Sequence, residues 1–136
     1  MRLFGVLLLA TGAIAQAPTF QPVGSVDEIM IRITYPTSNA IFYVGRNPPK
    51  EDRDWTALQN QALMMAESGN LLMMPGRVRD QGDWIKDSKM LVEVGAAAFK
   101  AAQDKDLDAV LALNEQLNTA CVTCHQQYRP NMRRRR

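Results

Sequence analysis

The segment Cys121-Val122-Thr123-Cys124-His125 lies eleven residues before the C-terminus and contains both cysteines and the only histidine of the 136-residue chain. On an α-helix, the spacing i, i+3, i+4 places the two thiols and the imidazole on one face. Pro130 follows closely and would end such a helix. The chain therefore gathers all its thiol and imidazole groups on one face of its last helix.

A Cys-x-x-Cys-His segment is the attachment motif for a c-type haem. A disulfide across two residues would close a small, strained loop with little entropic benefit. A thioredoxin-type pair normally begins a helix, and a zinc site would need a fourth Cys or His ligand. We therefore expect one covalently bound haem c, held by thioethers from Cys121 and Cys124, with His125 as an axial iron ligand.

The N-terminus has the pattern of a secretory signal peptide. Arg2 precedes the apolar residues 3–10, which are too few to span a bilayer, and small residues follow. We predict a signal peptide over residues 1–15, with residues 1–17 as the alternative. The protein is then periplasmic, with no stable membrane insertion.

Helical periodicity and helix breakers predict an all-α domain over residues 25–130, after a loose lead-in at residues 16–24. Ser25 and Glu28 form a capping-box pattern, and Pro36 should kink or split the first helix. Four helices with short connections predict an antiparallel up-down-up-down four-helix bundle with haem attached at its C-terminal end. The expected helices cover residues 26–44, 54–74, 83–103 and 107–128.

Apolar residues at helical spacing predict the inward faces of the second and third helices. In the second helix, these residues are Trp55, Leu58, Ala62, Met65 and Leu72. In the third helix, they are Ile85, Met90, Leu91, Val94, Ala98 and Ala101.

The charge distribution argues against a nucleic-acid-binding domain. The net charge is +2, but eleven basic residues face fourteen acidic ones once Arg2 and Arg133 to Arg136 are set aside. The basic tail, residues 131–136, could dock an acidic redox partner or a membrane headgroup surface. It could equally be a solubilising end of the chain.

Bundle topology narrows the search for a second axial ligand. In an up-down-up-down bundle, the end of the fourth helix meets the start of the first helix and the end of the second. Met30, Met73 and Met74 lie at that level, and a methionine thioether can ligate haem iron. Methionines on helices are more often core residues than ligands.

The segment Cys121-Val122-Thr123-Cys124-His125-Gln126-Gln127-Tyr128-Arg129 at the end of the last of four helices resembles the class II cytochromes c. This family includes cytochrome c′ and its low-spin relatives, in which an early methionine of the first helix is the sixth ligand. Met30-Ile31-Arg32-Ile33-Thr34-Tyr35-Pro36 is similar to a subgroup with a methionine six residues before a proline. The resemblance implies that Met30 is the sixth ligand, and the bundle topology leaves Met73 or Met74 as the next candidates.

Four further residues are candidate haem contacts. Arg129 could pair with a propionate, or it could only interact with the helix dipole. Tyr128 could pack on the haem edge or cap the bundle. Arg77, like Arg79, could meet a propionate or remain solvated.

These observations favour an exported monohaem cytochrome that carries single electrons between redox partner proteins, without substrate turnover and so without enzyme activity. The alternative is a five-coordinate, cytochrome c′-like protein that binds NO or CO at a vacant sixth site. A third possibility is a haem module of a larger redox assembly. The resemblance also allows a homodimer through the first helices, where Ile41-Phe42-Tyr43-Val44 is apolar.

Overall fold

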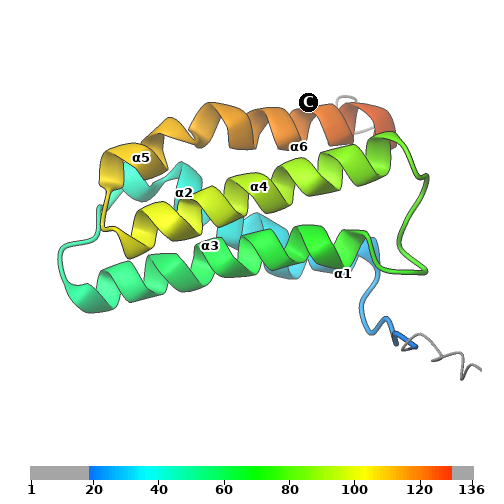
Figure 1. The fold of residues 1–136 in the computed structure, drawn as a ribbon, viewed down its shortest axis with the longest axis horizontal. Coiled ribbons are helices and arrows are strands. Elements are labelled where there is room, and N and C mark those ends of the chain that lie inside the picture. The colour runs from blue at the N-terminus through cyan, green and yellow to red at the C-terminus, as the bar shows by residue number, and fades with distance from the viewer. Residues whose placement is uncertain (1–18, 130–136) are drawn as a thin grey trace, which may run out of the picture.

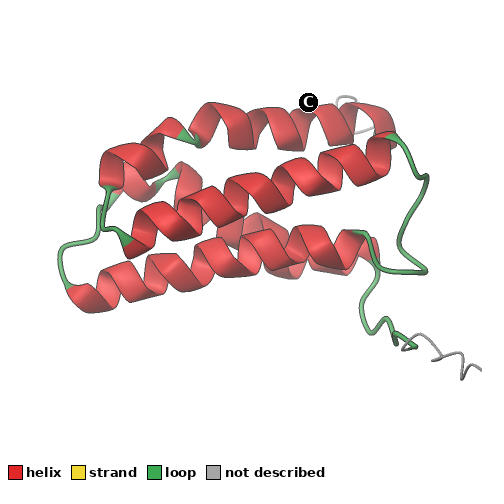
Figure 2. Cartoon of the chain, viewed as in Figure 1, coloured by secondary structure: helices red, strands yellow, loops and turns green. Residues whose placement is uncertain are grey.

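A computed structural model describes residues 19–129, which fold into helices without any strand in that range (Figures 1 and 2). The expected all-helical architecture with four helices is confirmed and is compatible with a helical bundle. The predicted signal peptide and basic tail lie outside the described residues. Across residues 19–129, no helix combines the length and the apolar character needed to cross a membrane.

Of the eight helical elements in residues 19–129, seven make up four helical stretches, and the eighth is a short 3₁₀-helix between the first two stretches. The first helical stretch contains three elements: α1 (Val26–Ile29), the π-helix η1 (Met30–Thr34) and α2 (Tyr35–Phe42). The short 3₁₀-helix η2 (Val44–Arg46) follows it, then the long helices α3 (Asp52–Leu72) and α4 (Asp83–Gln103). The fourth helical stretch contains α5 (Leu107–Ala112) and α6 (Asn114–Tyr128).

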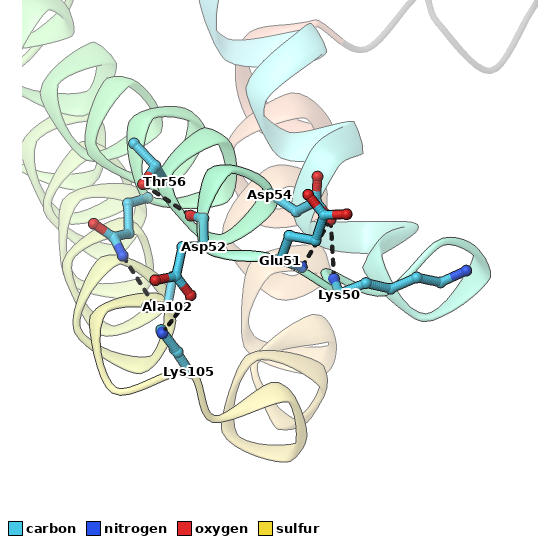
Figure 3. A network of polar contacts seen from close by, with 8 residues as sticks. Lys50, Glu51, Asp52, Asp54, Thr56, Ala102 and Lys105 are labelled. Carbon is cyan, nitrogen blue, oxygen red and sulfur yellow. Dashed lines mark hydrogen bonds and ion pairs between the residues drawn. The ribbon is translucent and has the colours of Figure 1, made fainter.

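Side-chain caps fix where two of these stretches begin. Ser25 and Glu28 form the predicted capping box, with the Glu28 amide 3.2 Å from Ser25 Oγ and the Ser25 amide 2.9 Å from Glu28 Oε2. At α3, Asp54 accepts from the amides of Lys50 and Glu51 at 3.0 and 3.1 Å (Figure 3). Both donor amides lie just before α3. This helix begins at Asp52, two residues earlier than predicted.

The π-helix η1 is how the chain accommodates Pro36. A proline has no N–H, and its ring clashes with the carbonyl four residues earlier in a regular α-helix. Here the Tyr35 amide donates to the Met30 carbonyl, five residues back, which widens the turn before the proline. The Thr37 hydroxyl donates to the Ile33 carbonyl at 2.7 Å. The expected disturbance at Pro36 therefore takes the form of a π-helical segment. The first helical stretch ends with α2 at Phe42, two residues before the predicted end at residue 44.

The prediction of one uninterrupted helix over residues 107–128 is wrong at Leu113. The Leu113 amide donates to the Val110 carbonyl, three residues back, at 3.2 Å. This tighter 3₁₀-type bond separates α5 from α6. The Leu117 amide still bonds to the Leu113 carbonyl at 2.9 Å, so the chain continues directly into α6.

The helices α3 and α4 lie side by side and approach each other closely through glycines (Figure 1). A Cβ atom added to Gly95 would lie 2.5 Å from the Ala66 backbone nitrogen. One added to Gly69 would lie 2.8 Å from the Ser88 carbonyl oxygen. Only hydrogen fits at these two positions, so the glycines set the distance between the two backbones.

The predicted inward faces form the core, with the five predicted residues of α3 and Leu91, Val94, Ala98 and Ala101 of α4 all buried. Ile85 packs partly buried against this core, whereas Met90 is half-buried.

We predict that Gly95→Ala destabilises the protein. Overpacking a closely packed site costs about 1–3 kcal/mol, more than the roughly 1 kcal/mol that alanine gains over glycine in helix propensity. Chemical denaturation should show a lower free energy of unfolding for the variant. Glu93→Ala, at an exposed position of α4, is the control and should change it little. A Gly95→Ala protein as stable as the wild type would contradict the close approach.

Candidate functional site

A cavity of about 550 Å³ opens between the first helical stretch, α4 and α6. Met30, Cys121, Cys124, His125 and Arg129 all line it. The structure therefore brings these five candidate residues of the sequence analysis together in one site.

The helix α6 presents the cysteines and the histidine to this cavity. Cys121, Cys124 and His125 are each half-buried, and the intervening Val122 and Thr123 are exposed. This alternation matches the predicted common face. The two thiols are free and form no disulfide with each other.

The first helical stretch forms the opposite wall with residues that recur every four positions. Met30, Thr34, Ser38 and Phe42 form one row along the cavity, and Ile31, Tyr35, Asn39 and Tyr43 form a second row. With 3.6 residues per turn, a regular α-helix rotates such a row by roughly 40° at each step. The wider π-turn at η1 offsets part of this rotation, so all eight residues remain on the cavity wall.

Burial keeps both thiols protonated at neutral pH. Desolvation raises the pKa of Cys121. It also raises the pKa of Cys124 to about 11, with the negative charge of Asp87 adding to the effect. Reactive redox cysteines have the opposite property, a lowered pKa that favours the thiolate. The pair is therefore poorly suited to thiol–disulfide exchange.

The surroundings of His125 favour a neutral imidazole. Burial lowers the pKa of His125, and the positive charge of Arg129 lowers it further. A neutral imidazole has a free nitrogen lone pair, which is the form that binds a metal.

Asp87 on α4 is a cavity residue that the sequence analysis missed. The residue is 3% exposed, and its Oδ2 atom has no hydrogen-bond partner among residues 19–129. Burial raises the pKa of Asp87, and the nearby charge of Asp83 raises it further, whereas Lys86 lowers it. Helical spacing could have identified it, because Asp87 is an acidic residue that lies between Trp84 and Leu91 on the apolar face of α4.

Arg77 lies outside the cavity lining. Its guanidinium donates to the Gly24 carbonyl at 3.1 and 2.9 Å and to the Leu71 carbonyl at 3.2 Å. The Met74 sulfur lies 3.2 Å from Arg77 Nη1. Arg77 therefore ties the segment before α1 to the end of α3, and neither Met73 nor Met74 lines the cavity.

Tyr128 also lies outside the cavity lining and joins the end of α6 to the start of α4. Its hydroxyl donates to the Asp80 carboxylate, and its ring meets Trp84 edge-on with centroids 4.9 Å apart. Trp84 is buried, and its Nε1 donates to the Leu72 carbonyl at 2.9 Å. Burial and the bond to Asp80 raise the pKa of Tyr128 to about 12, and the same bond lowers the pKa of Asp80. These contacts correspond to the bundle-capping role considered for Tyr128.

In the described part of the chain, no three His, Cys, Asp or Glu residues are grouped so that they could hold a metal ion by themselves. Comparison of the chain with protein-family models, curated proteins and solved structures found no match.

We predict that Tyr128→Phe lowers the thermal midpoint at pH 7, because it removes the bond to the Asp80 carboxylate. The folded-state pKa of Asp80 is lowered, so its stabilising effect is present above the unfolded pKa of about 4 and fades as the pH falls through the folded value. Thermal melts from pH 7 to pH 3 should show the two proteins converging at low pH.

Tyr43→Phe is the matched control, because the Tyr43 hydroxyl makes no hydrogen bond within residues 19–129. It keeps the ring that lies 4.2 Å from the Arg46 guanidinium carbon. A gap between Tyr128→Phe and wild type that is independent of pH would show that the Asp80 carboxylate is not the partner that matters.

Proposed function

We propose that the protein is an exported, periplasmic monohaem c-type cytochrome that carries single electrons between redox partner proteins. Cys121 and Cys124 would hold the haem covalently, His125 would be one axial ligand and Met30 the other. One observation carries the proposal: these four residues, which come from the first helical stretch and α6, line the same cavity.

The residues present fit a haem in size and in chemistry. The cavity volume of about 550 Å³ lies within the range of roughly 300–1,000 Å³ typical of cofactor sites. The thiols are free and protonated, and the imidazole is neutral. A porphyrin supplies four nitrogens to its iron, so the protein needs to add only one or two ligands.

The chain's residues have distinct roles in this proposal. Cys121 and Cys124 fix the cofactor to α6, and His125 supplies an imidazole nitrogen. Leu72, Leu91 and Phe42 keep water away from the apolar part of the cavity. When bound, the haem supplies one-electron chemistry at its iron, and the axial ligands and apolar surroundings set the reduction potential.

Met30 is the methionine that the cavity favours as sixth ligand. Among residues 19–129, it is the one methionine in the cavity lining, and it begins the π-helix η1. Segments of π-helix occur frequently at functional sites. Met74 instead contacts Arg77, so the alternative ligands of the sequence analysis have less support.

The finer architecture belongs to the same proposal. We propose an up-down-up-down bundle of the class II cytochrome c type, because the first helical stretch and α6 face each other across the cavity. The roles assigned to the cavity residues involve holding, ligating and excluding water, and none requires substrate turnover. A homodimer and an acidic docking partner for the basic tail also remain proposals.

We predict that the protein, expressed with a c-type haem attachment system, retains its haem after denaturation. Mass spectrometry of the denatured chain should show the added mass of one haem. Cys121→Ser combined with Cys124→Ser should show the mass of the chain alone, because both thioether bonds are lost. Haem that stays attached to the double variant through denaturation would refute the covalent assignment.

We further predict that Met30→Ala converts a low-spin absorption spectrum to a high-spin one and abolishes the methionine–iron charge-transfer band. The loss of a thioether ligand should also lower the reduction potential. Met64→Ala, at a position that is 45% exposed and outside the cavity lining, is the control and should leave the spectrum unchanged. A wild-type protein that is already high-spin when reduced and binds carbon monoxide rapidly would favour the five-coordinate, gas-binding alternative.

A further inference from the structure

Asp87 is a buried acidic group on the cavity wall that none of the roles above uses. It is 3% exposed, and Oδ2 finds no donor within the described residues, including His125 and the Cys124 thiol. An unpaired charge in such a place is costly, so a native protein normally supplies a partner or keeps the group neutral. The cavity contents, solvent included, or a proton on the carboxyl can supply the partner that Oδ2 lacks among the described residues.

The charges around Asp87 do not neutralise it. Lys86, its neighbour on α4, is exposed and is the cation that favours the charged carboxylate. Asp83 and Asp80 act in the opposite direction. From α6, the Cys124 thiol and the Tyr128 hydroxyl, whose pKa values the charge of Asp87 raises, are uncharged at neutral pH. His125 is neutral, and Arg129 is exposed.

The remaining walls add no charged group at neutral pH. Leu72 is the α3 residue in the cavity lining, and the first helical stretch contributes polar or apolar side chains, including the hydroxyls of Tyr35 and Tyr43.

We propose that Asp87 is the buried counter-charge of the haem iron and takes up a proton when the iron is reduced. The inference rests on the proposed haem function. A ferric haem has one more positive charge than a ferrous haem, so the carboxylate is better stabilised in the oxidised protein. In this exchange, a reduced donor protein would supply one electron, and solvent would supply the proton that converts the Asp87 carboxylate to the acid.

Two observations agree with this exchange. The pKa of Asp87 is already raised by burial and by neighbouring acids, so the proton affinity lies above that of an ordinary aspartate. The thiol pKa of Cys124, next to His125 in the sequence, is raised in part by the charge of Asp87. Asp87 is therefore electrostatically coupled to the segment that would hold the cofactor.

The test is the reduction potential of the haem-loaded protein measured spectroscopically from pH 4 to pH 9. Proton uptake on reduction makes the wild-type potential fall as the pH rises through the Asp87 titration. A tenfold difference in proton affinity between the two oxidation states corresponds to a total fall of about 59 mV. Asp87→Asn should remove this fall and give a potential above that of the wild type at high pH.

Asp83→Asn, an exposed position one turn earlier on α4, is the matched control and should keep the pH dependence. A haem-loaded Asp87→Asn protein with the wild-type dependence would overturn the proposal, as would a wild-type potential that does not vary with pH.

A second measurement needs no variant at Asp87. Reduction of the wild-type protein in weak buffer with an indicator dye should show proton uptake that is absent at high pH, and no uptake at any pH would overturn the proposal. Failure of the haem assignment would look different, because the denatured wild-type chain would then have no haem mass.

Discussion

The close contact of α3 with α4 at Gly95 and Gly69 is the constraint on which the rest of the structure depends. The absence of side chains there lets the two backbones approach, with Ala66 against Gly95 and with Val92 and the Ser88 carbonyl against Gly69. The first helical stretch then packs mainly on α3, and α6 packs mainly on α4. Because the first helical stretch and α6 make few contacts with each other, the cavity opens between them.

The chemistry of the cavity follows from this arrangement. Its walls bury the thiols and the imidazole enough to keep them uncharged. Uncharged groups of this kind suit covalent attachment of a cofactor and metal ligation better than thiol redox chemistry. The same burial surrounds Asp87, whose Oδ2 atom has no hydrogen-bond partner among residues 19–129. The cavity thus combines neutral potential ligands with one group that can gain or lose a charge.

Much of the fold could be predicted because its signals are local. Helical periodicity indicated the four stretches, and capping residues and prolines indicated most of their limits. The spacing of Cys121, Cys124 and His125 fixed their common face. The predicted apolar positions of α3 are all buried, because the burial of one face follows directly from the pattern.

The remaining features depend on contacts between distant segments. Pro36 signalled a disturbance, but a kink, a split and a π-helix satisfy the same sequence, and the contacts of η1 with the distant helix α3 could not be read from it. Arg77 was predicted to contact a haem propionate or to remain solvated, because its actual partner, the Gly24 carbonyl, lies 53 positions away in the sequence. Asp87 was missed because one acid on an apolar helix face is inconspicuous until the facing helices are placed.

The central claim is that one iron is held in this cavity by the imidazole of His125 and the thioether of Met30. X-ray absorption at the iron edge of the purified, haem-loaded protein tests this claim most directly. We predict one sulfur scatterer at bonding distance in addition to the porphyrin and imidazole nitrogens. A protein that retains no iron, or an iron without a sulfur neighbour, would contradict it.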